Sequence, residues 1–249
     1  MIKKRRCENI THLGETSKTK LGTTIKIIKY NGVNNLVVEC QDEHRYQAKS
    51  TYGNFKKGQF KNPYDKSVFG VGYIGDGIYK SRENPHRMTD AYNTWCNMLE
   101  RCYEEKLRYK HPTYANCYVC DDWHNYQVFA KWYYSNYYHI DGERIQLDKD
   151  IIENGNKKYN PQFCILVPQK INLVFQNKSK KSNLPTGIRL TSNEYVATYN
   201  TKNLGRFKFL EDAIEAYNAE KKNHIVELAN IYKNRVPMNV YEALINIKL

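Results

Sequence analysis

Alternating and continuous apolar stretches divide the chain into strand-like and helix-like regions. Short segments rich in β-branched and aromatic residues lie at 23–30, 35–40 and 44–49, and again at 187–191, 194–200 and 204–209. Turn-forming pairs such as Asn31-Gly32 separate them. The pattern predicts a small β-barrel or sheet near the N-terminus and a three-stranded sheet near the C-terminus.

Apolar residues at intervals of three and four predict helices between these regions. The expected helices lie at 91–105, 126–138, 168–176 and 210–233. Thr89 or Asp90 is suited to cap the first of them. Two strand-like segments, at 144–148 and 163–167, precede the third helix. This stretch therefore predicts a unit with the order strand, loop, strand, helix.

These elements predict an α+β protein in five parts. The expected parts are a flexible basic arm at 1–20, a small β domain at 21–66, a Gly-rich linker at 67–88, a central domain of helices with the strand–loop–strand–helix unit at 89–178, and a sheet-plus-helix domain at 184–249. Of the 249 residues, 41% are hydrophobic and 26% are charged, a balance typical of folded domains. No run of 18 apolar residues occurs, so we expect no membrane partner.

The net charge of +13 is concentrated toward the two ends of the chain. Residues 1–66 carry 14 basic and 6 acidic side chains (+8), residues 67–168 carry 12 and 13 (−1), and residues 169–249 carry 13 and 7 (+6). Basic flanks favour a polyanion partner such as nucleic acid, although surface lysines also serve solubility alone. The 22 tyrosines fit an RNA partner as well as a DNA partner on composition.

The seven cysteines are an odd number in a chain too long to need disulfides for its stability. They favour reduced thiols and an intracellular, cytoplasmic location. Cys117 and Cys120 have the CxxC spacing with which two thiolates bind one zinc ion. A structural Zn²⁺ would need further ligands from Cys102, Cys164 or His124, and buried free thiols are the alternative.

Two stretches of the chain resemble known families. LDKDIIENGNKKYNPQFCILVPQKIN (147–172) resembles the core of HNH (His-Me finger) endonucleases of phages, and YNTWCNMLERCY and CYVCDDWHNYQVFAKWY resemble the lead-in of phage-borne members. TGIRLTSNEYVATYNTKNLGRFKFLEDAIEAYNAEKKNHI (186–225) resembles the plant ethylene-response-factor (AP2-type) DNA-binding domain. Phage HNH proteins often carry this domain at the C-terminus, so the ordered pair is more specific than either stretch alone.

The HNH resemblance implies a ββα-metal core that hydrolyses DNA phosphodiester bonds with Mg²⁺ or another divalent cation. Carried over residue by residue, Asp148 and Asn172 match the metal ligands, and Asn156 matches the loop asparagine that orients the general base. Lys149 stands where the family has its general-base histidine. This is a departure from the family pattern.

A lysine acts as a base only if its pKa falls far below ~10.4, and neighbouring carboxylates have the opposite effect. We therefore expect Lys149, between Asp148 and Asp150, to contact a phosphate or to stabilise the leaving group. His139 and His124 are candidate bases by their proximity in sequence. The alternative is an inactive HNH scaffold that binds DNA, or that binds a protein partner and inhibits a bacterial nucleic-acid-handling or defence enzyme.

The AP2-type resemblance implies that the C-terminal sheet enters the major groove of double-stranded DNA. The side chains in strand positions suited to this role are Arg189, Tyr195, Thr198, Asn200, Arg206 and Lys208. Arginines are few, which favours contacts with the DNA backbone over base readout. The sequence thus predicts a phage-type, DNA-binding, HNH-like endonuclease that works in the cytoplasm of an infected bacterium, and this resemblance argues against RNA.

Overall fold

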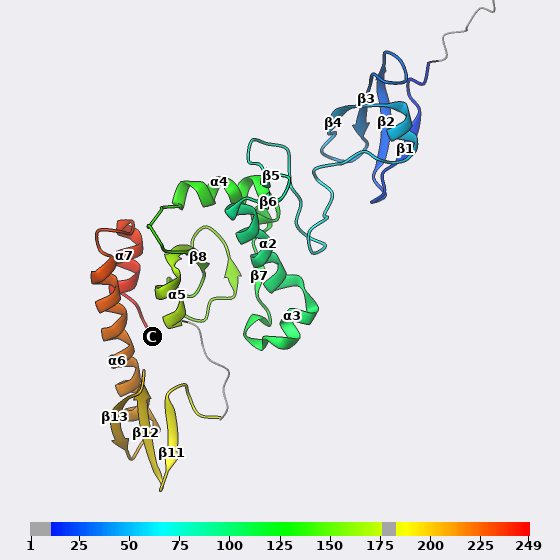
Figure 1. The fold of residues 1–249 in the computed structure, drawn as a ribbon. Coiled ribbons are helices and arrows are strands. Elements are labelled where there is room, and N and C mark those ends of the chain that lie inside the picture. Colours follow the sequence, from blue (N-terminus) through cyan, green and yellow to red (C-terminus); the bar gives the residue numbers. More distant parts are fainter. Residues whose placement is uncertain (1–10, 176–182) are drawn as a thin grey trace, which may run out of the picture. The chain divides into compact units, whose positions relative to one another are not determined.

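The computed structural model describes residues 11–175 and 183–249, so the part of the basic arm at 1–10 lies outside the described residues. The described chain is mixed α/β, with seven α-helices and several small sheets (Figure 1). Its contacts divide it into an N-terminal unit (1–81 with 124–127) and a C-terminal unit (82–123 with 128–249). Within the described ranges, none of the helices has the length and apolar character needed to span a membrane.

The N-terminal unit is built on an open antiparallel sheet. Its strands pair in chain order: β1 (Thr16–Lys18), β2 (Thr24–Tyr30), β3 (Leu36–Cys40) and β4 (Gln47–Ser50). The barrel alternative is wrong, because none of the sheets in the described chain closes and β1 and β4 remain at opposite edges. β1 also shows that the expected flexible arm is ordered in part.

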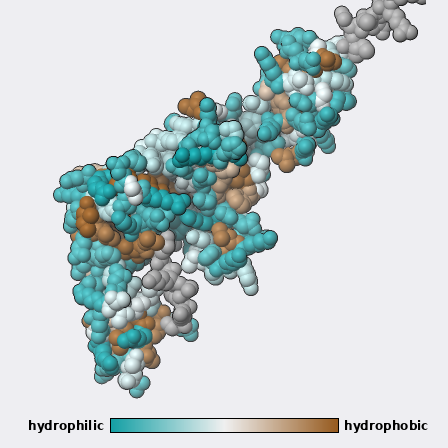
Figure 2. All heavy atoms as spheres, viewed as in Figure 1, coloured by the Kyte–Doolittle hydropathy of each residue, from teal (hydrophilic) through white to brown (hydrophobic). Residues whose placement is uncertain are grey.

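A small apolar core holds this sheet together. The short helix α1 (Tyr52–Lys56) covers one sheet face with Phe55, which is fully buried. The core consists of Ile25, Ile27, Leu36, Val38, Cys40, Phe55 and Phe60. The visible surface of the unit is mostly hydrophilic (Figure 2). The helix closes the core without any need for the strands to form a barrel.

Helices and two very short pairs of strands open the C-terminal unit. These elements are β5 (Arg82–Asn84), β6 (Arg87–Met88), α2 (Asp90–Tyr103), α3 (Glu105–Lys110), β7 (Tyr118–Val119), α4 (Tyr126–Asn136) and β9 (Lys158–Tyr159). Thr89 caps α2, because its side chain accepts a hydrogen bond from the backbone N–H of Tyr92. The buried face of α2 is the one that its apolar spacing predicts: Ala91, Trp95, Met98, Leu99 and Cys102.

A ββα motif follows, with the order that the sequence predicts. β8 (Ile145–Asp148) pairs antiparallel with β10 (Ile165–Pro168), and α5 (Gln169–Phe175) begins at the next residue. Asp148 lies opposite Ile165 and Gln146 lies opposite Val167, so these side chains share one face of the strand pair. On this face Ile165 and Val167 pack with α5, α6 (Leu210–Tyr232) and α7 (Met238–Ile245).

A three-stranded antiparallel sheet precedes α6 and packs on it, and we call it the terminal sheet. Its strands are β11 (Ile188–Thr191), β12 (Glu194–Tyr199) and β13 (Lys202–Phe207). Both hairpins turn through two residues with positive φ, Ser192-Asn193 and Asn200-Thr201, a geometry that matches the twist of paired strands. α6 runs from this sheet to α7 (Figure 1).

Candidate functional site

Asp148 ends β8 and is almost fully buried. Only 8% of its surface is exposed, and Oδ1 accepts hydrogen bonds of 2.8 Å from the backbone N–H groups of both Asp150 and Ile151. Burial raises the pKa of this carboxyl, and the two backbone hydrogen bonds oppose that shift. The carboxylate therefore fixes the turn with which the loop between the two strands begins.

Lys149 and Asn156 tie the two ends of this loop together. The Lys149 ammonium donates to Oδ1 of Asp150 at 2.7 Å and to the carbonyl oxygen of Asn156 at 2.5 Å. The Asn156 amide in turn donates to the carbonyl oxygens of Lys149 and Lys158. Lys149 is 6% exposed and carries its own counterion. In this arrangement it acts as a loop-stabilising cation and is not a free base.

Asn172 reaches from α5 to the same face of the ββα motif as Asp148. Its Nδ2 donates to Oε1 of Gln146 at 2.7 Å. Gln146 and Asp148 are two residues apart on β8, so their side chains point to one side of the strand. The structure thus brings Asp148 and Asn172 to a common face of the ββα motif.

The two candidate general bases, His139 and His124, lie outside the ββα motif. His139 lies in the exposed loop before β8, where its Nε2 lies 2.8 Å from Oδ1 of Asp141. It makes no hydrogen bond to Asp148. His124 belongs by its packing to the N-terminal unit. Proximity in sequence therefore does not place His139 in hydrogen-bond contact with the Asp148 carboxylate.

Arg101 is a functional candidate that the sequence analysis did not select. It lies on α2, where its guanidinium interacts chiefly with Tyr159 and Tyr114 and more weakly with the charge of Asp148. Together with Asn97 and Gln146 it lines a polar groove of about 490 Å³ beside β8. The available signal was the polar spacing of Asn93, Asn97 and Arg101 along one side of an otherwise apolar helix.

The side chains at this site do not form a metal centre in the arrangement described. Across residues 11–175 and 183–249, no group of three or more His, Cys, Asp and Glu side chains is placed to hold a metal ion. The implied ligands are one buried carboxylate, Asp148, and one amide, Asn172, that is already bonded to Gln146. Lys149 and Arg101 add positive charge near the carboxylate, which disfavours a further cation.

Among the described residues, no third His, Cys, Asp or Glu side chain is placed to bind a metal ion together with Cys117 and Cys120. Cys117 is buried, and its Sγ lies 3.9 Å from the carbonyl oxygen of Thr113. Burial raises the pKa of the Cys117 and Cys120 thiols, and it raises that of Cys102 to about 12. Zinc binds thiolates, so raised pKa values favour free thiols.

The terminal sheet presents two arginines on the face opposite α6. In the register Arg189 lies opposite Val196, and Val196 lies opposite Arg206, so the three side chains form one row across the sheet. We call the side of the sheet that carries this row the outer face. Tyr195, the residue before Val196, points to the other side and packs with the core against α6. Tyr195 is therefore not part of the outer face.

The other three predicted contact residues lie at the edges of this surface. Thr198 is in β12, but its hydroxyl donates to the carbonyl oxygen of Gly187. Asn200 has a φ of 44° in the turn between β12 and β13, and Lys208 follows the last residue of β13. The prediction that Asn200 and Lys208 occupy strand positions is wrong, because β12 ends one residue earlier, and β13 two residues earlier, than the apolar pattern suggests.

Comparisons with known proteins found no relative. No family model, no curated protein and no solved structure matches the chain. The HNH and AP2-type resemblances therefore rest on the residues quoted for them.

Proposed function

We propose that this protein binds double-stranded DNA with the outer face of the terminal sheet. The observation that supports the proposal most directly is the row formed by Arg189, Val196 and Arg206. Val196 is 2% exposed, although it points away from α6, whereas both flanking arginines are exposed. Two exposed guanidinium groups on one side of a sheet suit a surface that lies against a duplex, because arginine pairs with phosphate and with guanine.

The charge on this face remains available to a ligand. The acid that pairs with the row in the described chain is Glu194, whose carboxylate lies 3.6 Å from the Arg206 guanidinium, and both side chains are about half exposed. An exposed ion pair of this kind contributes little free energy, so a phosphate competes with it readily. With two arginines the surface favours backbone-led binding over extensive base readout.

The proposal is tested by DNA binding of the double variant Arg189→Gln/Arg206→Gln. A matched control, Lys131→Gln/Lys222→Gln, removes the same charge from exposed positions of α4 and α6. We expect the arginine variant to bind a duplex at least about tenfold more weakly and the control to change affinity by less than about threefold. Equal losses in both variants would show a nonspecific charge effect, and tighter binding of a single-stranded RNA of the same sequence would favour an RNA partner.

A second candidate function is hydrolysis of the bound DNA with a divalent cation. It is favoured by the common face of Asp148, Gln146 and Asn172 in the ββα motif. Because Oδ1 of Asp148 accepts both backbone hydrogen bonds, a cation would bind through Oδ2. Supercoiled plasmid is incubated with Mg²⁺, Mn²⁺ or a chelator, with Asp148→Ala as the control. Metal-dependent nicking that this substitution abolishes establishes the nuclease; binding without nicking supports an HNH-like scaffold that only binds.

A further inference from the structure

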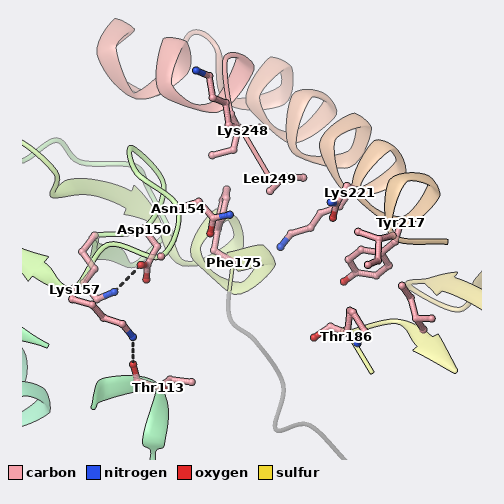
Figure 3. A pocket seen from close by; sticks show the side chains of 17 residues that line it. Thr113, Asp150, Asn154, Lys157, Phe175, Thr186, Tyr217, Lys221, Lys248 and Leu249 are labelled. Atoms are coloured by element: carbon pink, nitrogen blue, oxygen red, sulfur yellow. Dashed lines mark hydrogen bonds and ion pairs between the residues drawn. The ribbon is translucent and has the colours of Figure 1, made fainter. Parts of the chain in front are cut away.

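A pocket of about 390 Å³ lies within the C-terminal unit, on the side of α6 that faces the ββα motif (Figure 3). Its walls come from the loop at 149–157, from the end of α5 and from α6. Polar side chains at its rim are Thr113, Asn154, Thr186 and Asn218. None of the residues in the arginine row of the terminal sheet lines it, so the pocket is a separate site.

Lys221 is the cation that this pocket presents to a ligand. Its side chain extends from α6 into the cavity, and its ammonium lies 5.7 Å from the ring centroid of Phe175 (Figure 3). No carboxylate in the described part of the chain pairs with it. Burial lowers the pKa of this amine, because its charge is poorly solvated. An anion that enters the pocket would therefore stabilise the Lys221 ammonium, whose charge water solvates poorly.

The other charges around the cavity leave an excess of positive charge. Lys149 and Asp150 neutralise one another through their 2.7 Å ion pair. The ammonium of Lys157 donates to the carbonyl oxygen of Thr113 at 3.1 Å, which leaves its charge without a counterion. Lys248 also lines the pocket. Asp150 is thus the only acidic side chain among the lining residues, and it is already paired.

The lining also offers aromatic surface. The rings of Phe175 and Tyr217 belong to the cavity wall, beside the Lys221 side chain (Figure 3). Aromatic faces stack on flat heterocycles, while ammonium groups hold phosphate oxygens. A ligand that satisfies both is a nucleotide.

We propose that this pocket binds a nucleotide, with its phosphate on Lys221 and its base against Phe175 or Tyr217. Two sources supply this chemistry, a free nucleoside monophosphate and a nucleotide of the DNA strand that the terminal sheet binds. The site goes beyond the proposed function, because free nucleotide binding does not require the arginines of the outer face.

The test compares Lys221→Gln with Lys222→Gln, which removes the same charge from the next residue of α6, an exposed one. Lys221→Arg keeps the charge. The full chain is titrated by calorimetry with inorganic phosphate, with dTMP and with AMP, and each variant is also titrated with duplex and single-stranded DNA. We expect Lys221→Gln to weaken nucleotide binding at least about tenfold, while Lys222→Gln stays near the parent and Lys221→Arg retains most of the affinity.

The arms of this experiment separate the sources and the proposals. Binding of free dTMP or AMP that depends on Lys221 identifies a mononucleotide site. If free nucleotides do not bind and only Lys221→Gln loses affinity for DNA, the pocket binds a nucleotide of the DNA strand. If Lys221→Gln unfolds at the same temperature as the parent and changes neither titration, the pocket proposal is overturned. In that case, DNA binding that is lost only in Arg189→Gln/Arg206→Gln would still support the proposal that the terminal sheet binds DNA.

A second readout does not depend on affinity. Reductive methylation followed by mass spectrometry measures the accessibility of each lysine amine. Saturating dTMP, or a bound DNA strand, is expected to protect Lys221 from modification several-fold relative to Lys222. Equal modification of Lys221 with and without every ligand contradicts the site.

Discussion

The side-chain amide of Asn172 donates to Oε1 of Gln146 across 2.7 Å, and this bond joins α5 to the edge strand β8. Both residues are half-buried. On the strand, Gln146 stands beside Asp148, so the bond also sets the position of the amide relative to the carboxylate. The stability of the ββα motif and the geometry of its candidate site therefore depend on the same pair.

We expect Asn172→Ala to lower the free energy of unfolding by about 1 kcal/mol, because a partly buried hydrogen bond is lost and the Gln146 amide keeps partial access to water. Urea denaturation followed by circular dichroism measures this change. The matched variants are Gln146→Ala and the double substitution. A coupling energy of about 0.5–1.5 kcal/mol between the two sites is expected, and strictly additive losses would show that the bond contributes nothing.

Asp148 is expected to make stability fall as pH rises. Burial raises its pKa above the ordinary value of 3.8, so the folded chain holds this proton more tightly than the unfolded chain. The contribution of Asp148 is complete below pH 3.8 and is lost as pH rises through the folded pKa. Asp148→Asn removes the titration and keeps an oxygen acceptor for the amides of Asp150 and Ile151.

This prediction is measured as the difference in unfolding free energy between parent and Asp148→Asn from pH 3 to 8. The parent should lose stability relative to the variant above pH 3.8 and then reach a plateau. Comparing the two chains cancels the effect of the +13 net charge, which both share apart from this group. A parent that gains relative stability with increasing pH would mean that the carboxylate is favoured in its charged form.

DNA binding by the terminal sheet should depend steeply on salt. Each phosphate contact releases counterions, so the logarithm of affinity falls linearly with the logarithm of salt concentration. We expect the slope to become shallower by about 1 for each of Arg189→Gln and Arg206→Gln. Fluorescence anisotropy between ~50 and ~200 mM salt measures it. An unchanged slope in both variants would place these arginines outside the contact surface.

Gly187 is expected to be intolerant of a side chain. Its φ is +79°, and a Cβ there would come closer than 3.0 Å to the ring of Tyr217 and to the carbonyl oxygen of Thr198. Gly142 has a similar φ of +71° with open space around it. Gly142→Ala should cost about 1 kcal/mol from backbone strain alone, and Gly187→Ala about 1–3 kcal/mol more from the clash. Thermal unfolding of the two variants compares them, and equal costs would contradict the close packing of Tyr217.

The buried thiols are expected to react slowly in the folded chain. Burial raises the pKa of Cys40 and of Cys102 to about 12, so almost none of either thiol is ionised at neutral pH. Iodoacetamide labelling at pH 7.5 should proceed at least about tenfold faster in urea than in buffer.

Metal analysis of protein purified without a chelator is expected to find less than about a tenth of an equivalent of zinc. One bound equivalent would show that Cys117 and Cys120 form a site after all.

Elements with strong local signals were predicted well. α2 follows from a capping threonine and a continuous apolar stripe, and α6 follows from a long amphipathic pattern with acids in its first turn. The hairpins of the terminal sheet follow from β-branched and aromatic segments with polar residues between them. In each case residues near one another in sequence carry the information.

Elements that depend on distant partners were not predicted. The parallel pair β7 and β9 joins two-residue strands that lie about forty residues apart, and α7 is a short helix stabilised by packing on α6. At the candidate site the sequence identified Asp148 and Asn172, but the burial of Lys149 arises from the way the loop returns to place the carbonyl oxygen of Asn156 on its ammonium. The interaction of Arg101 with Asp148 likewise exists only after α2 packs beside β8.

α6 sets the distance between the terminal sheet and the ββα motif. Ala213 packs against the terminal sheet and Ala229 packs in the core with the ββα motif. At about 1.5 Å per residue the two contacts are about 24 Å apart along one continuous helix. This rise corresponds to about seven base pairs of duplex. With the outer face on a duplex as proposed, a continuous helix holds the ββα motif at a fixed distance from the sheet, so a footprint that reaches beyond the sheet should extend to one side by the same number of base pairs at every site.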